Sequence, residues 1–124
     1  MRLGLVAAFA LLLLSGCRKA EPPLSGGKPV NHWVQVLKDE NDPSLRKTAA
    51  FKLGNVGPTD PVVLPALTGA LKDADANVRC EAILALVKCG PAAKEAVPAL
   101  TEVQNQDRDA KVRSYAGKAL EKLQ

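Results

Sequence analysis

The stretch DPSLRKTAAFKL at residues 42–53 recurs twice along the chain in similar form, and this repeat decides the fold. It aligns with DANVRCEAILAL at residues 75–86 and with DAKVRSYAGKAL at residues 109–120, so the periods are 33 and 34 residues. A fixed period of this size is typical of proteins that stack small structural units along one axis. We therefore expect a repeat protein.

Each copy has the spacing of a helix with one apolar face. Apolar residues recur every three or four positions, and such residues lie on the same side of an α-helix. The second position of the series is alanine in every copy, so neighbouring helices can approach closely. The series are Leu45, Ala49, Leu53 and Val56; Val78, Ala82, Leu86 and Cys89; and Val112, Ala116, Leu120 and Leu123.

Signals for helix ends stand at the expected places. Asp42, Asp75 and Asp109 each precede a copy, where a carboxylate accepts hydrogen bonds from free N–H groups and favours the positive end of the helix dipole. Pro43 suits a first helical position. Glycines follow the first two copies, and a residue with positive φ is often needed there. These glycines are Gly57 and Gly90.

A second element alternates with the first. VLPALT at residues 63–68 aligns with AVPALT at residues 96–101, and Pro65 and Pro98 belong near the first turn of a helix, because a deeper proline would kink it. The sequence predicts an all-α fold, a short α-solenoid of antiparallel helix pairs with about 2.5 to 3 units. The expected helices span about 30–39, 43–55, 61–72, 76–88, 94–104 and 109–123.

The combined pattern Asp-x-x-Val/Leu-Arg-x-x-Ala-x-x-x-Leu, then Val/Leu-Pro-Ala-Leu, resembles HEAT repeats, of the HEAT-like variety first noted in phycobilisome lyases. The resemblance covers residues 30–124. It implies a solenoid whose second-element helices line a concave surface, where Thr68, Lys72, Thr101 and Gln104 are weaker candidates for contacts. A fold of this kind says little about activity.

Three arginines recur at the repeat spacing, so a solenoid would place them in a row. Such a row could hold an anionic ligand. The resemblance instead implies that recurring Asp and Arg tie adjacent repeats together, and we favour this structural ladder. Its expected members are the arginines Arg46, Arg79 and Arg113 with the acidic partners Asp42, Asp75 and Asp109.

The first 17 residues have the layout of an export signal. Arg2 precedes a run of twelve apolar or small residues at 3–14, which is shorter than the roughly 17–25 residues of a spanning helix. The run ends in Leu-Ser-Gly-Cys at residues 14–17, which resembles a lipobox. The resemblance implies cleavage of a signal peptide at residues 1–16 and attachment of several acyl chains to Cys17, which would anchor the protein stably in a membrane.

Residues 17–29 contain three prolines and two glycines and are predicted to be the lipidated cysteine followed by a flexible linker. A folded domain is expected at residues 30–124. Some lipoproteins carry an aspartate after the lipidated cysteine that keeps them in the inner membrane. This chain has Arg18, which favours the outer membrane over the inner membrane in a cell with two membranes.

Charge and composition exclude some partners. The chain has a net charge of +4, but from residue 30 onward we count 13 Lys or Arg against 12 Asp or Glu. Nucleic-acid binding usually needs a basic patch, and stacking on single strands needs several aromatic rings. The expected domain has only Trp33, Phe51 and Tyr115 as aromatic residues. We expect no nucleic-acid partner.

The sequence offers no set of residues for catalysis, so we expect no enzyme activity, cofactor or metal. His32 is the only histidine, which leaves neither a zinc cluster nor a Cys/His pair, and it is expected at the surface beside Trp33. Cys80 aligns with polar residues and is expected to be an exposed thiol, with an intermolecular disulfide as a less favoured alternative. Cys89 aligns with Val56 and is expected to be buried.

The remaining candidates concern binding. Phe51 and Leu84 align with each other and point away from the apolar face, so they are candidate contacts with a partner; packing against a neighbouring helix is the equal alternative. The last helix should present Tyr115, Leu120 and Leu123 to another copy or another protein.

The sequence thus favours a lipid-anchored interaction module, a scaffold or assembly adaptor of the cell envelope that binds a protein partner. The alternatives are a self-associating structural protein of the envelope and, less favoured, a lyase-like enzyme or enzyme subunit.

Overall fold

The computed structural model of the chain describes residues 24–124. The expected signal peptide, Cys17 and the first part of the linker lie outside the described residues. Six α-helices follow a short hairpin and pack into two layers. The elements are β1 (Leu24–Ser25), β2 (Lys28–Pro29), α2 (Val30–Asp39), α3 (Pro43–Val56), α4 (Val63–Ala70), α5 (Ala76–Lys88), the 3₁₀ helix η2 (Gly90–Ala96), α6 (Val97–Gln106) and α7 (Ala110–Leu123).

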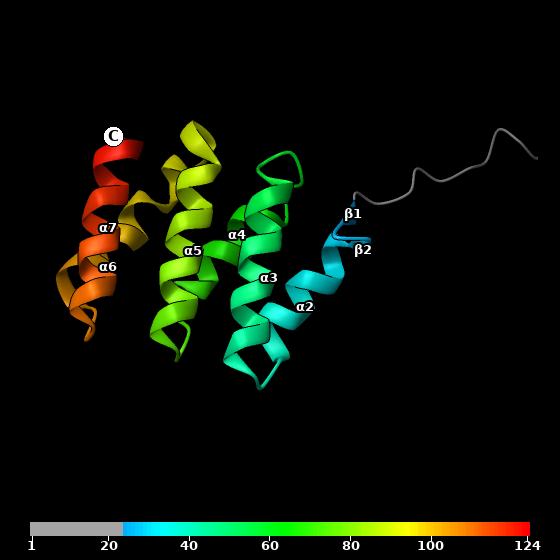
Figure 1. Cartoon of the computed structure of the whole chain (residues 1–124). Coiled ribbons are helices and arrows are strands. Elements are labelled where there is room, and N and C mark those ends of the chain that lie inside the picture. The colour runs from blue at the N-terminus through cyan, green and yellow to red at the C-terminus, as the bar shows by residue number, and fades with distance from the viewer. Residues whose placement is uncertain (1–23) are drawn as a thin grey trace, which may run out of the picture.

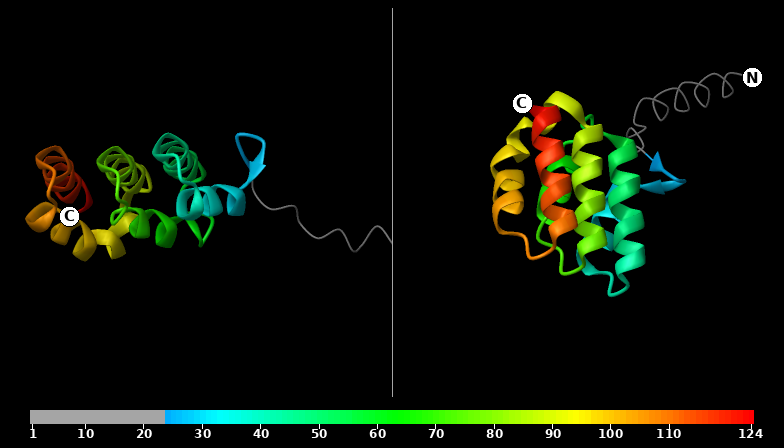
Figure 2. Two further views of the ribbon diagram at one scale, coloured as in Figure 1. Left: turned by 90° about the horizontal axis from the view of Figure 1, so that it is seen from below. Right: turned by 60° about the vertical axis from the view of Figure 1, so that its left-hand side comes forward.

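The layers follow the two alternating elements of the repeat. Helices α3, α5 and α7 lie side by side in one layer, which we call the A layer and which faces the viewer in Figure 1. Helices α2, α4 and α6 form the B layer, and Figure 2 shows the two rows from below. The predicted all-α solenoid of helix pairs is therefore confirmed, with three such pairs. None of the helices between residues 24 and 124 is long and apolar enough to cross a membrane.

The core lies between the layers and uses the predicted apolar face except at Leu45, which is 47% exposed. Ala49, Ala82 and Ala116 are completely buried, as expected for positions where helices approach closely. Gly54 marks the closest approach, because a Cβ atom built there would lie 2.8 Å from Ala85 Cβ. The largest fully buried side chains are Leu53, Leu67, Ile83, Leu86, Leu100, Val30, Val63, Val78 and Val112.

Both predicted glycine ends are confirmed. Gly57 and Gly90 have φ values of 77° and 64°, in the region that favours glycine, and they follow α3 and α5. One helix prediction needs a correction. Residues 90–96 form a 3₁₀ helix, and the α-helix begins only at Val97. Pro98 lacks the N–H group that would continue an α-helix from the preceding turn, so the chain uses the tighter 3₁₀ form there.

The second-element helix of the preceding unit is shorter than the predicted 61–72. It spans Val63–Ala70 and is followed by tighter turns, in which the N–H groups of residues 71–73 each donate to the carbonyl three residues earlier.

The predicted linker is structured at its end. Leu24 pairs with Pro29 and Ser25 with Lys28 in an antiparallel hairpin that contacts α2 and α3. Gly26 and Gly27 have φ values of 60° and 77°, and a two-residue turn with positive φ at both positions is the favoured hairpin connection. The expectation of an unstructured linker is therefore wrong for residues 24–29.

Candidate functional site

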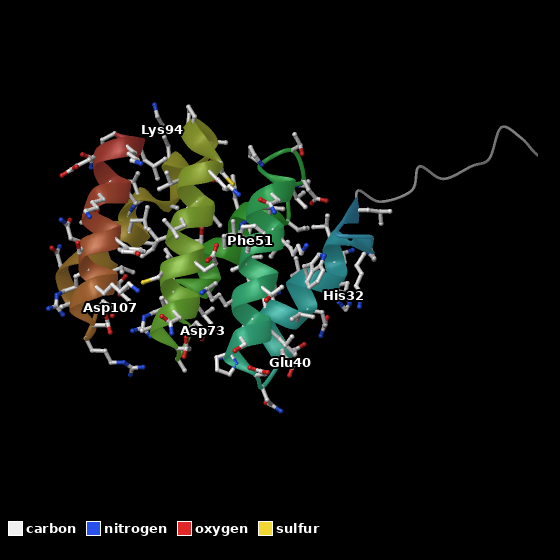
Figure 3. The ribbon with its side chains drawn as sticks, in the orientation of Figure 1. His32, Glu40, Phe51, Asp73, Lys94 and Asp107 are labelled. Carbon is white, nitrogen blue, oxygen red and sulfur yellow. The ribbon has the colours of Figure 1, made fainter. Side chains whose placement is uncertain are left out.

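The loops that lead from the B layer to the A layer carry the most polar part of the structure. Figure 3 shows Glu40, Asp73 and Asp107 in a row along one edge of the solenoid. Each of them lies two residues before an aspartate that begins an A-layer helix. The edge therefore repeats one local arrangement three times.

The predicted helix caps are confirmed. Asp42 accepts a hydrogen bond from the backbone N–H of Ser44 at 2.8 Å, and Asp75 accepts from Asn77 and Val78 at 2.9 and 3.1 Å. Asp109 accepts from Lys111 and Val112 at 2.8 and 3.1 Å. These carboxylates satisfy N–H groups that a helix start otherwise leaves without partners.

The predicted arginine ladder exists, but its acidic partners differ from the expected ones. Arg46 donates from Nε and Nη2 to Asp73, at 2.9 and 3.0 Å. Arg79 donates from the same two atoms to Asp107, at 2.9 Å each. Each pair joins one unit to the next, as the ladder prediction required. The assignment of the three capping aspartates as the partners of these arginines is wrong, because those carboxylates accept from backbone N–H groups.

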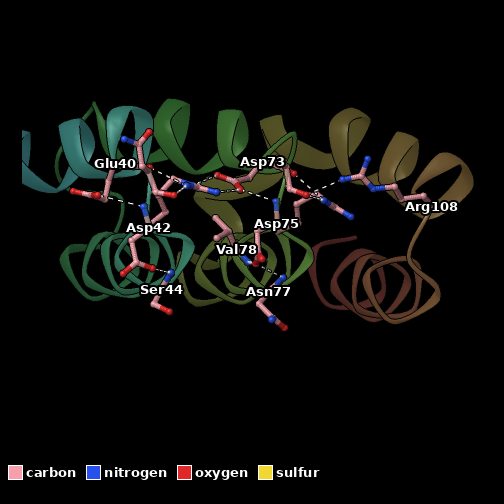
Figure 4. Close-up of polar contacts among 12 residues, drawn as sticks. Glu40, Asp42, Ser44, Asp73, Asp75, Asn77, Val78 and Arg108 are labelled. Atoms are coloured by element: carbon pink, nitrogen blue, oxygen red, sulfur yellow. Dashed lines mark hydrogen bonds and ion pairs between the residues drawn. The ribbon is translucent and has the colours of Figure 1, made fainter.

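The third nitrogen of each guanidinium binds the loop behind it. Nη1 of Arg79 donates to the carbonyl oxygens of Asp73 and Ala74 at 2.8 and 3.1 Å, and Nη1 of Arg46 does the same with residues 40 and 41 (Figure 4). Only 5% of the surface of Arg79 is exposed. An arginine whose three nitrogens already donate to a carboxylate and two carbonyl oxygens has little capacity for a further anion, so these two rungs are structural.

Arg113 departs from this pattern. Its Nη1 donates to the carbonyl oxygen of Asp107 at 2.6 Å, but among residues 24–124 no carboxylate forms an ion pair with it. It is half-buried. The ladder prediction therefore holds for Arg46 and Arg79 and is incomplete at Arg113.

The true partners belong to a second recurring acidic position, which makes them candidates in the sequence beside the caps. Acidic residues stand two positions before the caps in all three units, as Glu40, Asp73 and Asp107. Their side chains also accept from the backbone N–H of the following cap residue, at 3.2, 2.9 and 2.9 Å. The acidic-x-Asp pattern thus contains a residue that binds the loop or the arginine and a residue that caps the helix, and only the cap was predicted.

The carboxyl group of Asp107 is charged, because its hydrogen bonds and nearby positive charges lower its pKa more than burial raises it. Burial acts to raise the pKa of Asp107, but the hydrogen bond from Arg79, the N–H of Asp109 and the charges of Arg79 and Arg108 lower it below the ordinary value of 3.8. A carboxyl group with a lowered pKa stabilises the folded state above its unfolded pKa and loses that effect as pH falls through the folded pKa.

We expect acid to remove this stabilisation. The free energy of unfolding of the wild type should fall between about pH 5 and pH 2, and the difference between wild type and Asp107→Asn should shrink over the same range, because the amide of the variant has no charge to lose. Urea titrations at several pH values would measure both. A difference that stays constant down to pH 2 would contradict a charged Asp107–Arg79 pair.

The two cysteines within residues 24–124 are buried. Cys89 is buried as predicted, but Cys80 is only 6% exposed, so the expectation of an exposed thiol is wrong. Lys47 and Ser114, with which it aligns, are exposed; Cys80 lies on the central helix of the A layer, which has a neighbour on each side. Burial raises the pKa of both thiols. A buried thiol with little thiolate reacts slowly, which disfavours the disulfide between molecules.

His32 lies beside Trp33, with their rings edge to face and 5.0 Å apart, but it is half-buried and not at the open surface. Helix α2 has one apolar face, on which Val30 and Leu37 are buried and Trp33 packs partly against the core. Within residues 24–124, no three metal-ligating side chains lie close enough to hold an ion.

The candidate binding residues separate into two groups. Phe51 and Leu84 are 45% and 48% exposed on the A layer, so these side chains are accessible to a partner, and Tyr115 is half-buried near Leu84. Leu120 and Leu123 are only 6% and 5% exposed, so their prediction as exposed contacts is wrong. They pack into the core because α6 and η2 cover that face of α7.

The surface has two larger hollows. One, of about 590 Å³, lies between α4 and α6 in the B layer and includes Thr68 and Lys72 of the weaker candidates, whereas Thr101 and Gln104 do not line it. The other, of about 510 Å³, lies between α5 and α7 in the A layer and includes Leu84 and Tyr115. The structure thus gathers part of each predicted set at a separate groove.

Comparison with known proteins agrees with this geometry. No curated protein matches the chain. The family of HEAT repeats matches residues 30–121, which is most of the chain and includes all six described α-helices, the last of them up to residue 121. Helix pairs at a period of 33 or 34 residues and ion pairs between successive units agree with that match. The chain belongs to the HEAT repeat family.

Proposed function

We propose that the protein is a lipid-anchored interaction module of the cell envelope, a scaffold or adaptor that binds a protein partner. HEAT repeats are commonly non-enzymatic scaffolds for protein interactions, because stacked helices create an extended rigid surface. The Leu-Ser-Gly-Cys sequence at residues 14–17 supports the anchor on Cys17. Arg18 favours the outer membrane where there are two.

One observation carries the proposal. Phe51 and Leu84 occupy the same position in successive repeats, and both leave almost half of a large apolar side chain in water. The core does not use this part of their surface. Large apolar side chains on a rigid layer are typical anchors of protein interfaces, where a few such residues supply most of the binding energy.

A second candidate is self-association as a structural envelope protein. Leu45 favours it, since this residue is 47% exposed while its repeat equivalents Val78 and Val112 are fully buried. The face of α3 that bears Leu45 could therefore pack against another copy. The resemblance to phycobilisome lyases alone supports the third possibility, an enzyme subunit, and covalent turnover of a bilin by the purified protein would be its test.

The deciding experiment compares the wild type with Cys17→Ser in the cells that make the protein. Envelope membranes are crosslinked, the protein is captured by a tag at Gln124, and captured proteins are identified by mass spectrometry. We expect the wild type to carry diacylglycerol on Cys17 and to recover one specific partner that Cys17→Ser loses. Recovery of the protein alone would support self-association, and recovery of nothing with either protein would contradict the proposal.

A further inference from the structure

The groove in the A layer has an apolar floor and a charged rim with more lysine than glutamate. It lies between α5 and α7, with a volume of about 510 Å³, and its floor is formed by Ile83, Leu84, Val87 and Tyr115. Lys118, Glu121 and Lys122 stand at its edge, so its charged lining is two lysines and one glutamate. A recess of this kind fits apolar side chains that enter from outside, with opposite charges beside them.

Phe51 extends the apolar surface beyond the groove. It lies one repeat before Leu84, and the ammonium group of Lys88 lies 4.9 Å from the centre of its ring. Lys111 takes a similar place over Tyr115, at 5.6 Å. Lysine stems cover aromatic rings while their charged ends stay in water. Each of the two aromatic rings of the apolar stripe from α3 to α7 therefore has a lysine beside it.

The charge of the A layer is one-sided. Its three helices carry six lysines against two glutamates, whereas the B-layer helices carry one lysine, one aspartate and one glutamate. The A-layer arginines Arg46 and Arg79 add little, because Asp73 and Asp107 neutralise them. A near-neutral domain thus presents one basic face, and a partner that matches it must be acidic.

We propose that the groove between α5 and α7 receives an amphipathic acidic helix of a partner protein. Apolar side chains of that helix fill the groove against Leu84 and reach Phe51, and its carboxylates face Lys88, Lys118 and Lys122. This inference rests on the proposed function and names the face and the chemistry of the partner. Helices bound in grooves place their anchors three or four residues apart, which matches a recess that runs between two parallel helices.

The other hollow fits a partner less well. The B-layer groove is larger, but none of the exposed large apolar side chains of residues 24–124 lines it. Its charged lining is one lysine against two carboxylates, whereas the A-layer groove has two lysines against one. An anionic membrane would also attract lysines. A bilayer surface is broad, however, and cannot enter a recess between two helices, so a protein helix is the better occupant.

The test places a photo-crosslinking residue, p-benzoylphenylalanine, at Leu84 of the full-length protein in the cells that make it. The control carries the same residue at Thr101, which is exposed on α6 of the B layer. We expect a protein crosslink from Leu84 that Thr101 does not form. Sequencing the crosslinked peptide should show an acidic segment with apolar residues three or four positions apart.

Charge reversal provides the second measurement. Lys118→Glu with Lys122→Glu should lower the yield of the Leu84 crosslink roughly tenfold, since two attractive ion pairs are lost and reversal adds repulsion. Lys38→Glu with Lys94→Glu changes the net charge equally on exposed sites elsewhere and should leave the yield unchanged. Thermal melts would show that both pairs of variants fold.

The outcomes separate the two proposals. Four results would each overturn the acidic-helix inference. Two concern the crosslink itself: it forms from Thr101 but not from Leu84, or Leu84 becomes attached to lipid alone. The other two concern charge: the crosslinked segment has no acidic residues, or the crosslink yield does not change with Lys118→Glu and Lys122→Glu. The proposed function would survive those results if a protein partner is still captured. Loss of protein crosslinks at both positions, with no captured partner, would overturn both.

Discussion

Arg79→Ala is expected to lower the free energy of unfolding by about 3–5 kcal/mol, because it removes one member of a buried ion pair. The side chains of Arg79 and Asp107 are only 6% and 8% exposed. The substitution would leave the carboxylate of Asp107 buried without its cation and would take a donor from two carbonyl oxygens, those of Asp73 and Ala74. A domain of this size has a total stability of roughly 5–15 kcal/mol, so the loss would be a large share.

Arg113→Ala is the matched control. Arg113 occupies the same repeat position, but it donates only one hydrogen bond to the described residues and pairs with none of their carboxylates. Its replacement should cost about 1 kcal/mol, the net value of an ordinary hydrogen bond. Urea titration followed by circular dichroism would measure both variants. Equal losses would mean that the Arg79–Asp107 pair does not tie the units together.

This comparison also shows which part of the ladder was predictable. The arginine row follows from the period alone, since residues at the same repeat position must line up in a solenoid. The partner of each arginine depends on how far one unit is displaced from the next. Asp73 and Asp75 lie two residues apart, so the sequence alone makes both of them candidate partners of Arg46. Only the stacking geometry decides which one faces Arg46.

The burial of three side chains was predicted wrongly for a related reason. Helix spacing identifies which residues share a face, but it does not say which faces are covered by a second neighbour. Cys80 aligns with polar residues and still lies in the core, since its helix α5 is packed between α3 and α7. Leu120 and Leu123 were expected to be exposed contacts with another copy or another protein. They turn inward toward α6 and η2 instead.

The local features were predicted better than the contacts between units. The caps at Asp42, Asp75 and Asp109 and the glycine ends at Gly57 and Gly90 depend on a few adjacent residues, so their spacing is enough to identify them. Phe51 and Leu84 were also placed correctly, because a residue opposite the apolar face of an outer helix has no layer beyond it. The A-layer groove was not predicted, since it requires residues from two helices whose relative position is set by packing.

Leu120 lies in the core and Leu84 at the surface, so their replacement should change stability by different amounts. Leu120→Ala is expected to lower the free energy of unfolding by about 2–5 kcal/mol, the usual cost of removing a buried leucine side chain together with the cavity that it leaves. Leu84→Ala should cost less than about 0.5 kcal/mol, since 48% of Leu84 is already in water. The two leucines lie in the same layer of helices, so the pair makes a controlled comparison measured by urea titration.

The same pair separates folding from binding. If Leu84 anchors a partner, Leu84→Ala should reduce capture of that partner while the protein remains as stable as the wild type. A loss of binding in Leu120→Ala would instead follow from partial unfolding, and it should disappear when binding is measured at a temperature well below the melting temperature of this variant. A Leu84→Ala protein that unfolds as readily as Leu120→Ala would place Leu84 in the core and remove it from the binding surface.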